Sequence, residues 1–440
     1  MTREQLEKRF IDLAFESPQT YAKDLTEIHD KVAHSKAIYK GKPIPFLYMP
    51  RFFDSADMDT FNEAVSHMMS ICHKMIKLYK SVSEIRQYYN FDERLEALIL
   101  KESPYASLVP MARFDIFYYG PGEFKFCELN TDGTSAMNED KELARVFSSG
   151  ALVDKISEEV ALNSFELFDT WVEEVMSIYK ESGGIKEKPS IAIVDLFEKS
   201  SAIEFEVFKE RFEAHGLPCY IVDARQLTYN EGLFYEDKGV DIVYRRLVTR
   251  DMMDRIQELP ALEAACHDNT TLIIGNIQSQ VVHNKLFFKL LHDDLVRQYF
   301  NAEELAFIDA HVPLTESIEV AGHNIQRYID EKDQWLIKPL DFYASIGVYA
   351  GRDHDPQAWR QLLEDHLQKP YLLQAFCTPP EFLNIDLVEG ALKLDSYKHI
   401  TGLFVYNGKL FGIYSRAGRT AIISGLHDVF TLPSLFIGNS

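Results

Sequence analysis

The 440-residue chain is poor in cysteine and in positive charge. Its five cysteines are widely spaced and include no CxxC pair, which argues against a disulfide framework or a cysteine zinc site and fits a reducing compartment. Lys and Arg number 46 against 68 Asp and Glu, so the formal net charge is −22. Because a nucleic-acid-binding surface is expected to be basic, we predict no nucleic-acid partner. The acidity favours a cationic ligand such as a polyamine or simply keeps protein molecules apart, and net charge does not decide between these interpretations.

Long apolar runs are missing as well. No stretch approaches the ~18 uninterrupted apolar residues of a membrane-spanning helix. The N-terminus reads MTREQLEKRFIDLAF, which is amphipathic, carries both charge signs and contains no apolar core of a secretory signal. We therefore expect a cytoplasmic protein that has no membrane partner.

Several common catalytic motifs are also absent. The chain has no GxxxxGK[ST] phosphate loop, no HExxH, no GxSxG and no EF-hand spacing, and its 14 histidines show no metal-ligand spacing. No GxGxxG follows the first strand of the α/β region described below, so a dinucleotide site is not supported. Any nucleotide chemistry must therefore use a different set of residues.

The composition that remains is that of a globular protein, with 46% apolar and 26% charged residues. The length suggests about two to four domains or subdomains. We expect a mixed α/β fold in four parts: a mostly helical region at 1–105, a part with a polar hairpin at 106–187, a Rossmann-like α/β region at 188–276, and a strand-rich part at 277–440. Strand–helix alternation predicts a parallel sheet in the third part, and Asn-Gly at 407–408 predicts a hairpin in the fourth.

A run of Met, Cys and aromatic residues recurs at helical spacing between Phe61 and Tyr79. Such a stripe is either a metal or cofactor box or the core-facing side of a helix. The second interpretation is the more common one, because amphipathic helices bury their apolar side.

The most informative segment is RFDIFYYGPGEFKFCELN, which runs from Arg113 to Asn130. The Gly-Pro-Gly turn predicts two antiparallel strands at 113–119 and 124–130. With a loop at 120–123, Arg113 is expected to face Asn130 and Asp115 is expected to face Glu128. Residues two apart on a strand point the same way, so the four polar groups should form one patch.

Two interpretations of this patch are open. Opposed carboxylates repel each other, and a cation relieves that repulsion. Asp115, Glu128 and Asn130 offer the oxygen ligands that suit Mg²⁺, and Arg113 would then complete a phosphate or carboxylate clamp. Alternatively, Arg113 simply neutralises Asp115 or Glu128 in a salt bridge. The turn at 132–135, Asp-Gly-Thr-Ser, favours the metal interpretation.

An R-x-D strand, a turn and an E-x-N strand together resemble the magnesium-binding signature of ATP-grasp ligases. In ordinary ATP-grasp proteins this signature comes last in the chain, whereas here it precedes the candidate nucleotide-binding lysines. This order is similar to that of circularly permuted ATP-grasp proteins, specifically the synthetase domain of glutathionylspermidine synthase and its relatives. The resemblance spans roughly residues 110 to 435.

Four further segments match the family in the expected order, namely HNKLFFKLL, WLIKPLDFYASIGVYAG, YLLQAFCTPPEF and FGIYSRAGRTAIIS. The resemblance implies that Lys285 and Lys338 contact ATP phosphates and that Arg416 lies at the transferring phosphate. It implies nucleotide-binding roles for the phosphate-loop and adenine-hinge residues Ser345, Gly347, Gln374 and Phe376, and a ribose contact for Glu381. Read without the resemblance, Lys285 is a solvated lysine at a helix start, Gly347 a turn residue, Gln374 a core amide and Arg416 a salt-bridge partner.

The resemblance implies an ATP- and Mg²⁺-dependent ligase that joins a small-molecule or peptide carboxylate to an amine through an acyl phosphate. Arg113 and Arg416 would stabilise the charge that develops during transfer. The segment TDGTSAMNED departs from the family's D-T-P-T, and the loop after Lys338 lacks an R-E-G run, so glutathione and spermidine are not assigned as substrates. Two alternatives remain: an ATP-dependent small-molecule kinase and a catalytically silent nucleotide-binding protein. Arg245 and Arg246 bind a substrate carboxylate or form structural salt bridges.

Overall fold

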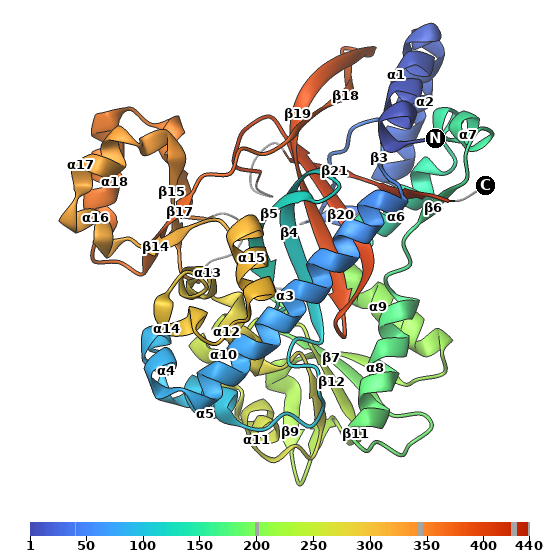
Figure 1. Ribbon diagram of the computed structural model, residues 1–440. Coiled ribbons are helices and arrows are strands. Elements are labelled where there is room, and N and C mark those ends of the chain that lie inside the picture. The colour runs from blue at the N-terminus through green and yellow to red at the C-terminus, as the bar shows by residue number, and fades with distance from the viewer. Residues whose placement is uncertain (40, 199–201, 342–345, 424–428, 439–440) are drawn as a thin grey trace.

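A six-stranded antiparallel sheet lies at the centre of the computed structural model, which describes residues 1–39, 41–198, 202–341, 346–423 and 429–438 (Figure 1). Its strand order is β21-β20-β19-β4-β5, and β18 also pairs with β19. The strands are β4 (Met111–Gly120), β5 (Glu123–Asn130), β18 (Glu381–Val388), β19 (Ala391–Tyr406), β20 (Lys409–Gly418) and β21 (Val429–Leu432). One sheet thus joins two segments from opposite ends of the sequence.

The two hairpins of this sheet form where the sequence predicts them. Strand β19 ends at Tyr406 and β20 begins at Lys409, with Asn407 at φ +47° and Gly408 at φ +84°. Two consecutive left-handed residues are the geometry that an Asn-Gly hairpin turn requires. The β4–β5 turn likewise contains Gly120 and Gly122 at positive φ. The local sequence is therefore sufficient to explain both turns.

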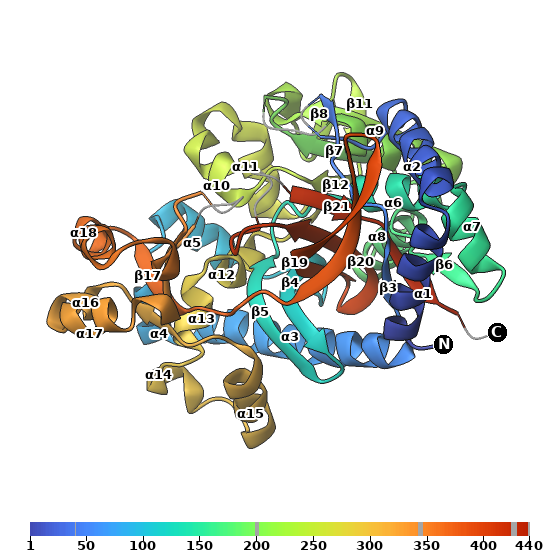
Figure 2. The ribbon, with the colours of Figure 1, turned by 90° about the horizontal axis from the view of Figure 1, so that it is seen from above.

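The long helix α3 (Ser55–Ser81) crosses one face of the central sheet and contacts β19 and β20, whereas α6 (Met137–Phe147) lies on the other side against β20 and β21 (Figures 1 and 2). The apolar stripe between Phe61 and Tyr79 is buried in the main hydrophobic core. The core interpretation of that stripe is therefore confirmed. The remaining N-terminal helices are α1 (Arg3–Glu16), α2 (Pro18–Ala33), α4 (Ser83–Tyr89) and α5 (Glu93–Leu100).

A second, four-stranded sheet has the order β13-β12-β7-β8, and all of its neighbouring strands are parallel. The alternation of strands and helices predicts this arrangement, and that prediction is confirmed. Alternate residues of β7 enter different cores: Ile191 and Ile193 pack with α8 and α9, whereas Ala192 and Val194 belong to the main core. The elements are β7 (Ile191–Asp195), β8 (Cys219–Asp223), β12 (Ile242–Arg245), β13 (Leu272–Ile274), α8 (Asp169–Glu181), α9 (Ala202–Ala214), α10 (Thr249–Asp254) and α11 (Pro260–Asp268).

A smaller lobe projects from the body and carries its own antiparallel sheet, with the order β14-β17-β15-β16 (Figure 1). Its core contains Trp335 and Trp359. The elements are β14 (Thr315–Ser317), β15 (Trp335–Pro339), β16 (Tyr349–Ala350), β17 (Tyr371–Ala375), α16 (Glu319–His323), α17 (Ile325–Asp330) and α18 (Pro356–His366). Short helices join this lobe to the body: α12 (Gln280–His283), α13 (Leu286–Leu290), α14 (Asp294–Arg297) and α15 (Ala302–His311).

Three short sheets complete the structure. The sheet β3-β22-β6 draws together distant parts of the chain, and the sheets β1-β2 and β11-β10-β9 are local. Their strands are β1 (Ile38–Tyr39), β2 (Lys42–Pro43), β3 (Arg51–Phe53), β6 (Leu162–Ser164), β9 (Leu227–Tyr229), β10 (Leu233–Tyr235), β11 (Lys238–Val240) and β22 (Ser434–Ile437), and the remaining helix is α7 (Ala151–Ser157). Within the part of the chain that the structure describes, every helix is too short or too polar to traverse a lipid bilayer.

Candidate active site

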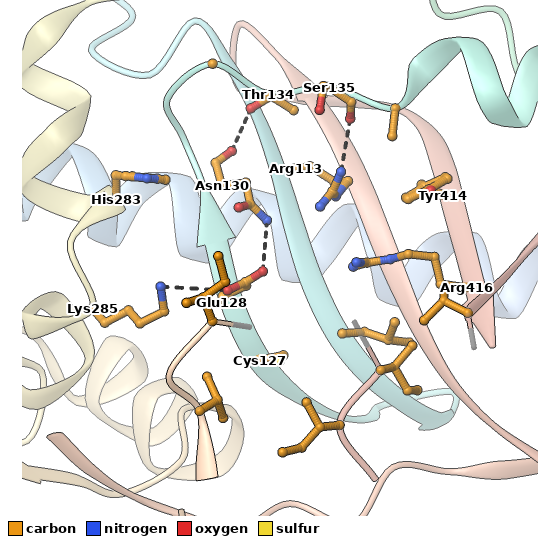
Figure 3. Close-up of a pocket in the computed structure, with 18 of the residues that line it drawn as sticks. Arg113, Cys127, Glu128, Asn130, Thr134, Ser135, His283, Lys285, Tyr414 and Arg416 are labelled. Atoms are coloured by element: carbon orange, nitrogen blue, oxygen red, sulfur yellow. Dashed lines mark hydrogen bonds and ion pairs between the residues drawn. The ribbon is translucent and has the colours of Figure 1, made fainter. Parts of the chain in front are cut away.

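The polar hairpin has the predicted register. Arg113 lies opposite Asn130, and Asp115 lies opposite Glu128. The pairing shifts by one residue immediately after Asp115, so a bulge separates the polar end of the hairpin from its apolar remainder. The side chains of Arg113, Glu128 and Asn130 project from the same side of the two strands (Figure 3).

Asp115 is fully buried between two arginines. Arg113 donates from Nε to Oδ1 at 2.7 Å and from Nη2 to Oδ2 at 3.1 Å. Arg416, on β20, donates from Nη2 to Oδ2 at 2.6 Å. Burial opposes the ionisation of Asp115, but the two guanidinium groups outweigh it and hold the pKa of this carboxyl below its ordinary value. Arg113 thus forms the salt bridge that the sequence left open, and Arg416 shares the same carboxylate.

Two neighbours fix the two arginines. The Tyr414 ring lies between them, with its centroid 5.2 Å from the Arg113 Cζ and 5.3 Å from the Arg416 Cζ. Gly402 on β19 is the register partner of Asp115. A Cβ on Gly402 would lie 2.7 Å from the Arg113 Cδ and 2.9 Å from the Asp115 Oδ1. The absence of a side chain at this position therefore makes room for the buried ion pair.

Glu128 and Asn130 form the open end of the patch. The Asn130 amide Nδ2 donates to the Asp115 Oδ2 at 3.2 Å and to the Glu128 Oε1 at 3.5 Å. Lys285, which immediately precedes α13, places its Nζ 3.9 Å from the Glu128 Oε2 (Figure 3). Burial lowers the pKa of Lys285, and the Glu128 carboxylate counteracts part of that effect.

The oxygen donors of this patch fit Mg²⁺ only in part. Glu128 and Asn130 offer a carboxylate and an amide facing the cavity described below. Both oxygens of Asp115, by contrast, are taken up by arginines. Across the described ranges, no cluster of three or more Asp, Glu, His or Cys side chains is arranged to hold a metal ion. A Mg²⁺ ion held by two side chains would complete its shell with waters and phosphate oxygens, as this ion usually does.

The second group of predicted residues approaches from the small lobe. Lys338 on β15 is buried, and its Nζ donates to the Cys127 carbonyl oxygen at 3.2 Å. Gln374, on the adjacent strand β17, is buried and donates from Nε2 to the Thr315 Oγ1 at 3.0 Å. The ring of Phe376 lies 4.1 Å from the Arg352 Cζ. Gln374 and Lys338 thus come from neighbouring strands of one sheet.

Both groups line one cavity of about 950 Å³. A volume of this size accommodates a nucleotide together with a small second ligand. The predicted residues on its wall are Arg113, Glu128, Asn130, Lys285, Lys338, Gln374, Phe376 and Arg416. Basic and acidic groups therefore meet in one cavity, and parts of its wall come from the central sheet and from the small lobe.

No protein-family model and no curated protein matches the chain. Among solved structures, a glutathione synthetase like-effector from Globodera pallida in its apo form superposes with a TM-score of 0.64 at 13% identity, covering 96% of this chain and 98% of that chain. The fold is that of ATP-grasp-like proteins. More distant likenesses are a putative gamma-glutamylcysteine synthetase from Methylobacillus flagellatus KT (TM-score 0.40, 9% identity, 84% and 88% covered) and D-alanyl-alanine synthetase A from Vibrio cholerae (0.30, 11%, 56% and 88%).

The other three residues that are predicted to bind the nucleotide are Ser345, Gly347 and Glu381. Ser345 lies outside the described residues. Gly347 has φ +75° and stands between Ile346 and Val348, both of which line the cavity. Glu381 is exposed on β18, pairs with the Lys398 Nζ at 3.2 Å and is not among the residues of the cavity wall. The geometry therefore gives Glu381 no part in this cavity, because a salt bridge on the surface holds its carboxylate.

The arginines at the end of β12 form structural salt bridges. Arg245 is fully buried and donates from Nη2 to the Asp132 Oδ1 at 2.6 Å. Arg246 donates from Nη2 to the Glu204 Oε1 at 2.6 Å. Asp132 also anchors the turn that follows β5, where a Cβ on Gly133 would meet the Arg246 carbonyl oxygen at 2.7 Å. The turn at 132–135 lines the cavity, as its proposed functional role requires.

Several cavity residues were not foreseen. His283, Asp341, Tyr414 and Glu139 all line the same space. Two of them are close in the sequence to predicted site residues: His283 stands two residues before Lys285, and Asp341 stands three residues after Lys338. Glu139 had no such signal, since its position depends on how the first turn of α6 packs against distant segments.

Proposed function

We propose that this protein is an ATP-dependent carboxylate–amine ligase that forms an amide through an acyl phosphate. The observation that carries the proposal is the single cavity in which Lys285 and Lys338 face the patch of Arg113, Glu128 and Arg416. Two lysines suit the phosphates of ATP, and two arginines suit a transferring phosphoryl group and the carboxylate that attacks it. The ATP-grasp-like fold supports this assignment.

Each residue then has a defined task. Lys285 and Lys338 bind ATP phosphates, and Gln374 and Phe376 border the adenine. Arg113 and Arg416 are catalytic residues: they orient the acceptor carboxylate and stabilise the charge that develops on the phosphoryl oxygens. Their guanidinium groups are already aligned by Asp115, so little reorganisation is needed on reaction.

Glu128 and Asn130 would hold Mg²⁺, with Asp115 contributing negative charge behind them. When bound, Mg²⁺ would neutralise negative charge on the phosphate oxygens and make the phosphorus more electrophilic. We propose that Gly347 and its neighbours cover the phosphates and keep water from the acyl phosphate, which water would otherwise hydrolyse.

We also propose that the catalytic unit is split in the sequence. The metal-binding part (106–187) and the nucleotide-binding part (277–440) would flank a Rossmann-like insertion (188–276), after a helical region (1–105). The sharing of one sheet by β4, β5, β19 and β20 supports this division. A permuted motif order, similar to that of glutathionylspermidine synthase, is part of the same proposal.

The test begins with a screen of ADP release over pairs of acids and amines, including small peptides, glutathione, amino acids and polyamines, with products identified by mass spectrometry. The proposal predicts amide formation with at least one pair. Glu128→Ala should abolish amine-dependent ADP release and leave the fold intact. Glu123→Ala, at the exposed start of the same strand, is the matched control and should behave as the wild type.

Three outcomes contradict the assignment in different ways. A phosphorylated product without amide would identify a kinase. ATP binding without turnover on any pair would identify a silent nucleotide-binding protein. Full activity of Glu128→Ala would remove the proposed role of Glu128 in holding Mg²⁺.

A further inference from the structure

Three buried carboxylates lie at the N-terminus of helix α6, those of Glu139, Asp140 and Glu204, and only Glu139 lines the cavity. The backbone N–H groups of Met137 and Asn138 donate to the Glu204 Oε2 at 2.8 and 3.2 Å. The other oxygen of Glu204 holds Arg246. Asp140 accepts a hydrogen bond from the Ser434 N–H at 2.9 Å. The third carboxylate, Glu139, precedes Asp140 in the first turn of α6.

Glu139 is buried and has no ion-pair partner among the described residues. It is 8% exposed and lines the cavity. Within the described part of the chain, its carboxylate makes no hydrogen bond or ion pair with another residue, whereas Asp115, Asp132 and Glu204 each hold an arginine. A buried charge without a partner is costly, so proteins rarely keep one unless a ligand compensates it.

The groups that face Glu139 come from four elements. They are Glu204 on α9, Arg246 after β12, Arg113 on β4 and Tyr414 on β20. Burial, and then repulsion from Glu204, raise the pKa of Glu139 well above its ordinary value, although the two arginines act in the opposite direction. Neither arginine donates to Glu139: Arg113 donates to Asp115 and to the Ser135 carbonyl oxygen, and Arg246 donates to Glu204 and to the Tyr244 hydroxyl.

The surrounding wall of the cavity is acidic and partly apolar. We call it the acidic wall; it consists of Glu139, Asp195, Phe205, Arg246, Val248 and Asp251. Burial raises the pKa of Asp195 to about 6. The hydrocarbon surfaces of Phe205 and Val248 suit an aliphatic stem next to a cationic head. A lone carboxylate is a poor site for a divalent metal, which needs several oxygens, but it suits an ammonium group.

We infer that the acidic wall is the subsite for the amine substrate, in which Glu139 binds the ammonium group and accepts one of its protons. This inference rests on the proposed ligase function, because Glu139 lies beside Arg113, where the acyl phosphate would form. Transfer of a proton from R–NH₃⁺ to the carboxylate leaves R–NH₂ and a neutral Glu139. The amine nitrogen then attacks the acyl carbon, the carbon–oxygen bond to phosphate breaks, and the second N–H proton leaves on hydrogen phosphate.

The experiment measures amine binding rather than turnover. n-Butylammonium chloride is titrated calorimetrically into the full-length wild type, Glu139→Gln and Glu142→Gln, in two buffers of different ionisation enthalpy near neutral pH. Glu142 is the matched control because it lies on the same helix, pairs with the Arg145 Nη2 at 2.9 Å and is not among the cavity-lining residues. n-Butanol serves as the neutral isostere.

We expect the wild type and Glu142→Gln to bind n-butylammonium and not n-butanol, with loss of affinity of at least about tenfold in Glu139→Gln. Because the cation lowers the raised pKa of Glu139, binding should release protons in the wild type and none in Glu139→Gln. Equal affinity in Glu139→Gln, binding without proton release, or no binding to the wild type would each overturn the inference.

The same samples separate this inference from the ligase proposal. Thermal shift with ATP and Mg²⁺ reports the nucleotide site in every variant. Glu139-dependent amine binding without any ATP response would leave the subsite standing and count against the ligase. An ATP response with Glu139-independent amine binding would remove only the role of Glu139.

Discussion

Asp115 and Arg416 are 301 residues apart in the sequence, yet the Arg416 Nη2 lies 2.6 Å from the Asp115 Oδ2. The contact arises because β4 and β20 both pair with β19, which places them on either side of one strand. Arg113 completes the arrangement from the same strand as Asp115. One carboxylate therefore aligns two guanidinium groups toward the cavity.

The first prediction concerns that carboxylate. Asp115→Asn leaves two buried guanidinium groups facing each other without a counter-charge, so we expect a loss of about 3–5 kcal/mol in unfolding free energy. Urea denaturation followed by circular dichroism measures it. Glu381→Gln removes a surface pair and should leave the midpoint unchanged. Wild-type stability in Asp115→Asn would show that the ion pair contributes nothing to the fold.

The second prediction concerns Gly402, which lies next to the ion pair of Arg113 and Asp115. Gly402→Ala places a Cβ within 3 Å of both Arg113 and Asp115, and such overpacking costs about 1–3 kcal/mol. Gly239→Ala is the control, since the nearest atom to its added Cβ is 3.8 Å away. We expect only Gly402→Ala to lower the thermal midpoint and to weaken ATP-dependent turnover. Truncating Arg113 in the Gly402→Ala background should cost less than truncating it alone.

The third prediction concerns Lys338. Met preserves the length of the side chain within its apolar strand but removes the charge. A charge-assisted hydrogen bond contributes about 1.5–3 kcal/mol, so Lys338→Met should weaken binding of a non-hydrolysable ATP analogue about 10- to 100-fold by calorimetry. Lys369→Met, at an exposed position before β17, is the control. Unchanged affinity in Lys338→Met would place the phosphates elsewhere.

The fourth prediction concerns pH and Asp140. This carboxyl is fully buried, one of its oxygens lacks a partner among the described residues, and burial raises its pKa to about 7. The folded state thus holds a proton that the unfolded chain has released above its ordinary pKa of 3.8. Stability should therefore fall as pH rises from about 4 to about 7 and stay reduced above that.

Asp140→Asn keeps the acceptor for the Ser434 N–H and stays neutral. We expect this variant to be more stable than the wild type by about 2–4 kcal/mol near pH 8, with the difference vanishing near pH 4. Urea denaturation across this range provides the measurement. Asp154→Asn, on the exposed face of α7, should follow the wild-type curve. A parallel pair of curves for Asp140→Asn and wild type would rule out the titration of Asp140.

The pairing at the polar end of the hairpin was predictable from the Gly-Pro-Gly turn, and two-residue spacing shows which side chains share a face. The bulge was not predictable: the pairing shifts between Tyr118 and Gly120 and again between Asp115 and Ile116, and the two shifts cancel. The position of Arg416 had no such local signal. Its approach to Asp115 depends on strand order within a sheet, which residue spacing does not contain, and the family resemblance implied only a place at the transferring phosphate.

Other features depended on tertiary partners that the sequence does not indicate. The role of Arg246 stayed open because Glu204, its partner, lies on a separate helix. The surroundings of Glu139 likewise depend on packing, because the two nearby arginines, Arg113 and Arg246, donate to Asp115 and Glu204 instead. Glu381 lies outside the cavity and forms a salt bridge with Lys398 on the paired strand of a hairpin. A motif resemblance does not detect such pairing.

The central sheet also constrains how the protein is made. During synthesis, β4 and β5 leave the ribosome long before β19. The edge of β4 that pairs with β19 therefore stays unpaired until β19 has been made. Such sequence-distant pairing slows folding, because a long loop must close before the strands meet. A chain divided inside the helical connection at 277–311 would carry Arg113 and Glu128 on one fragment and Arg416 on the other. Co-expression of the two fragments should restore a nucleotide response that neither fragment shows alone.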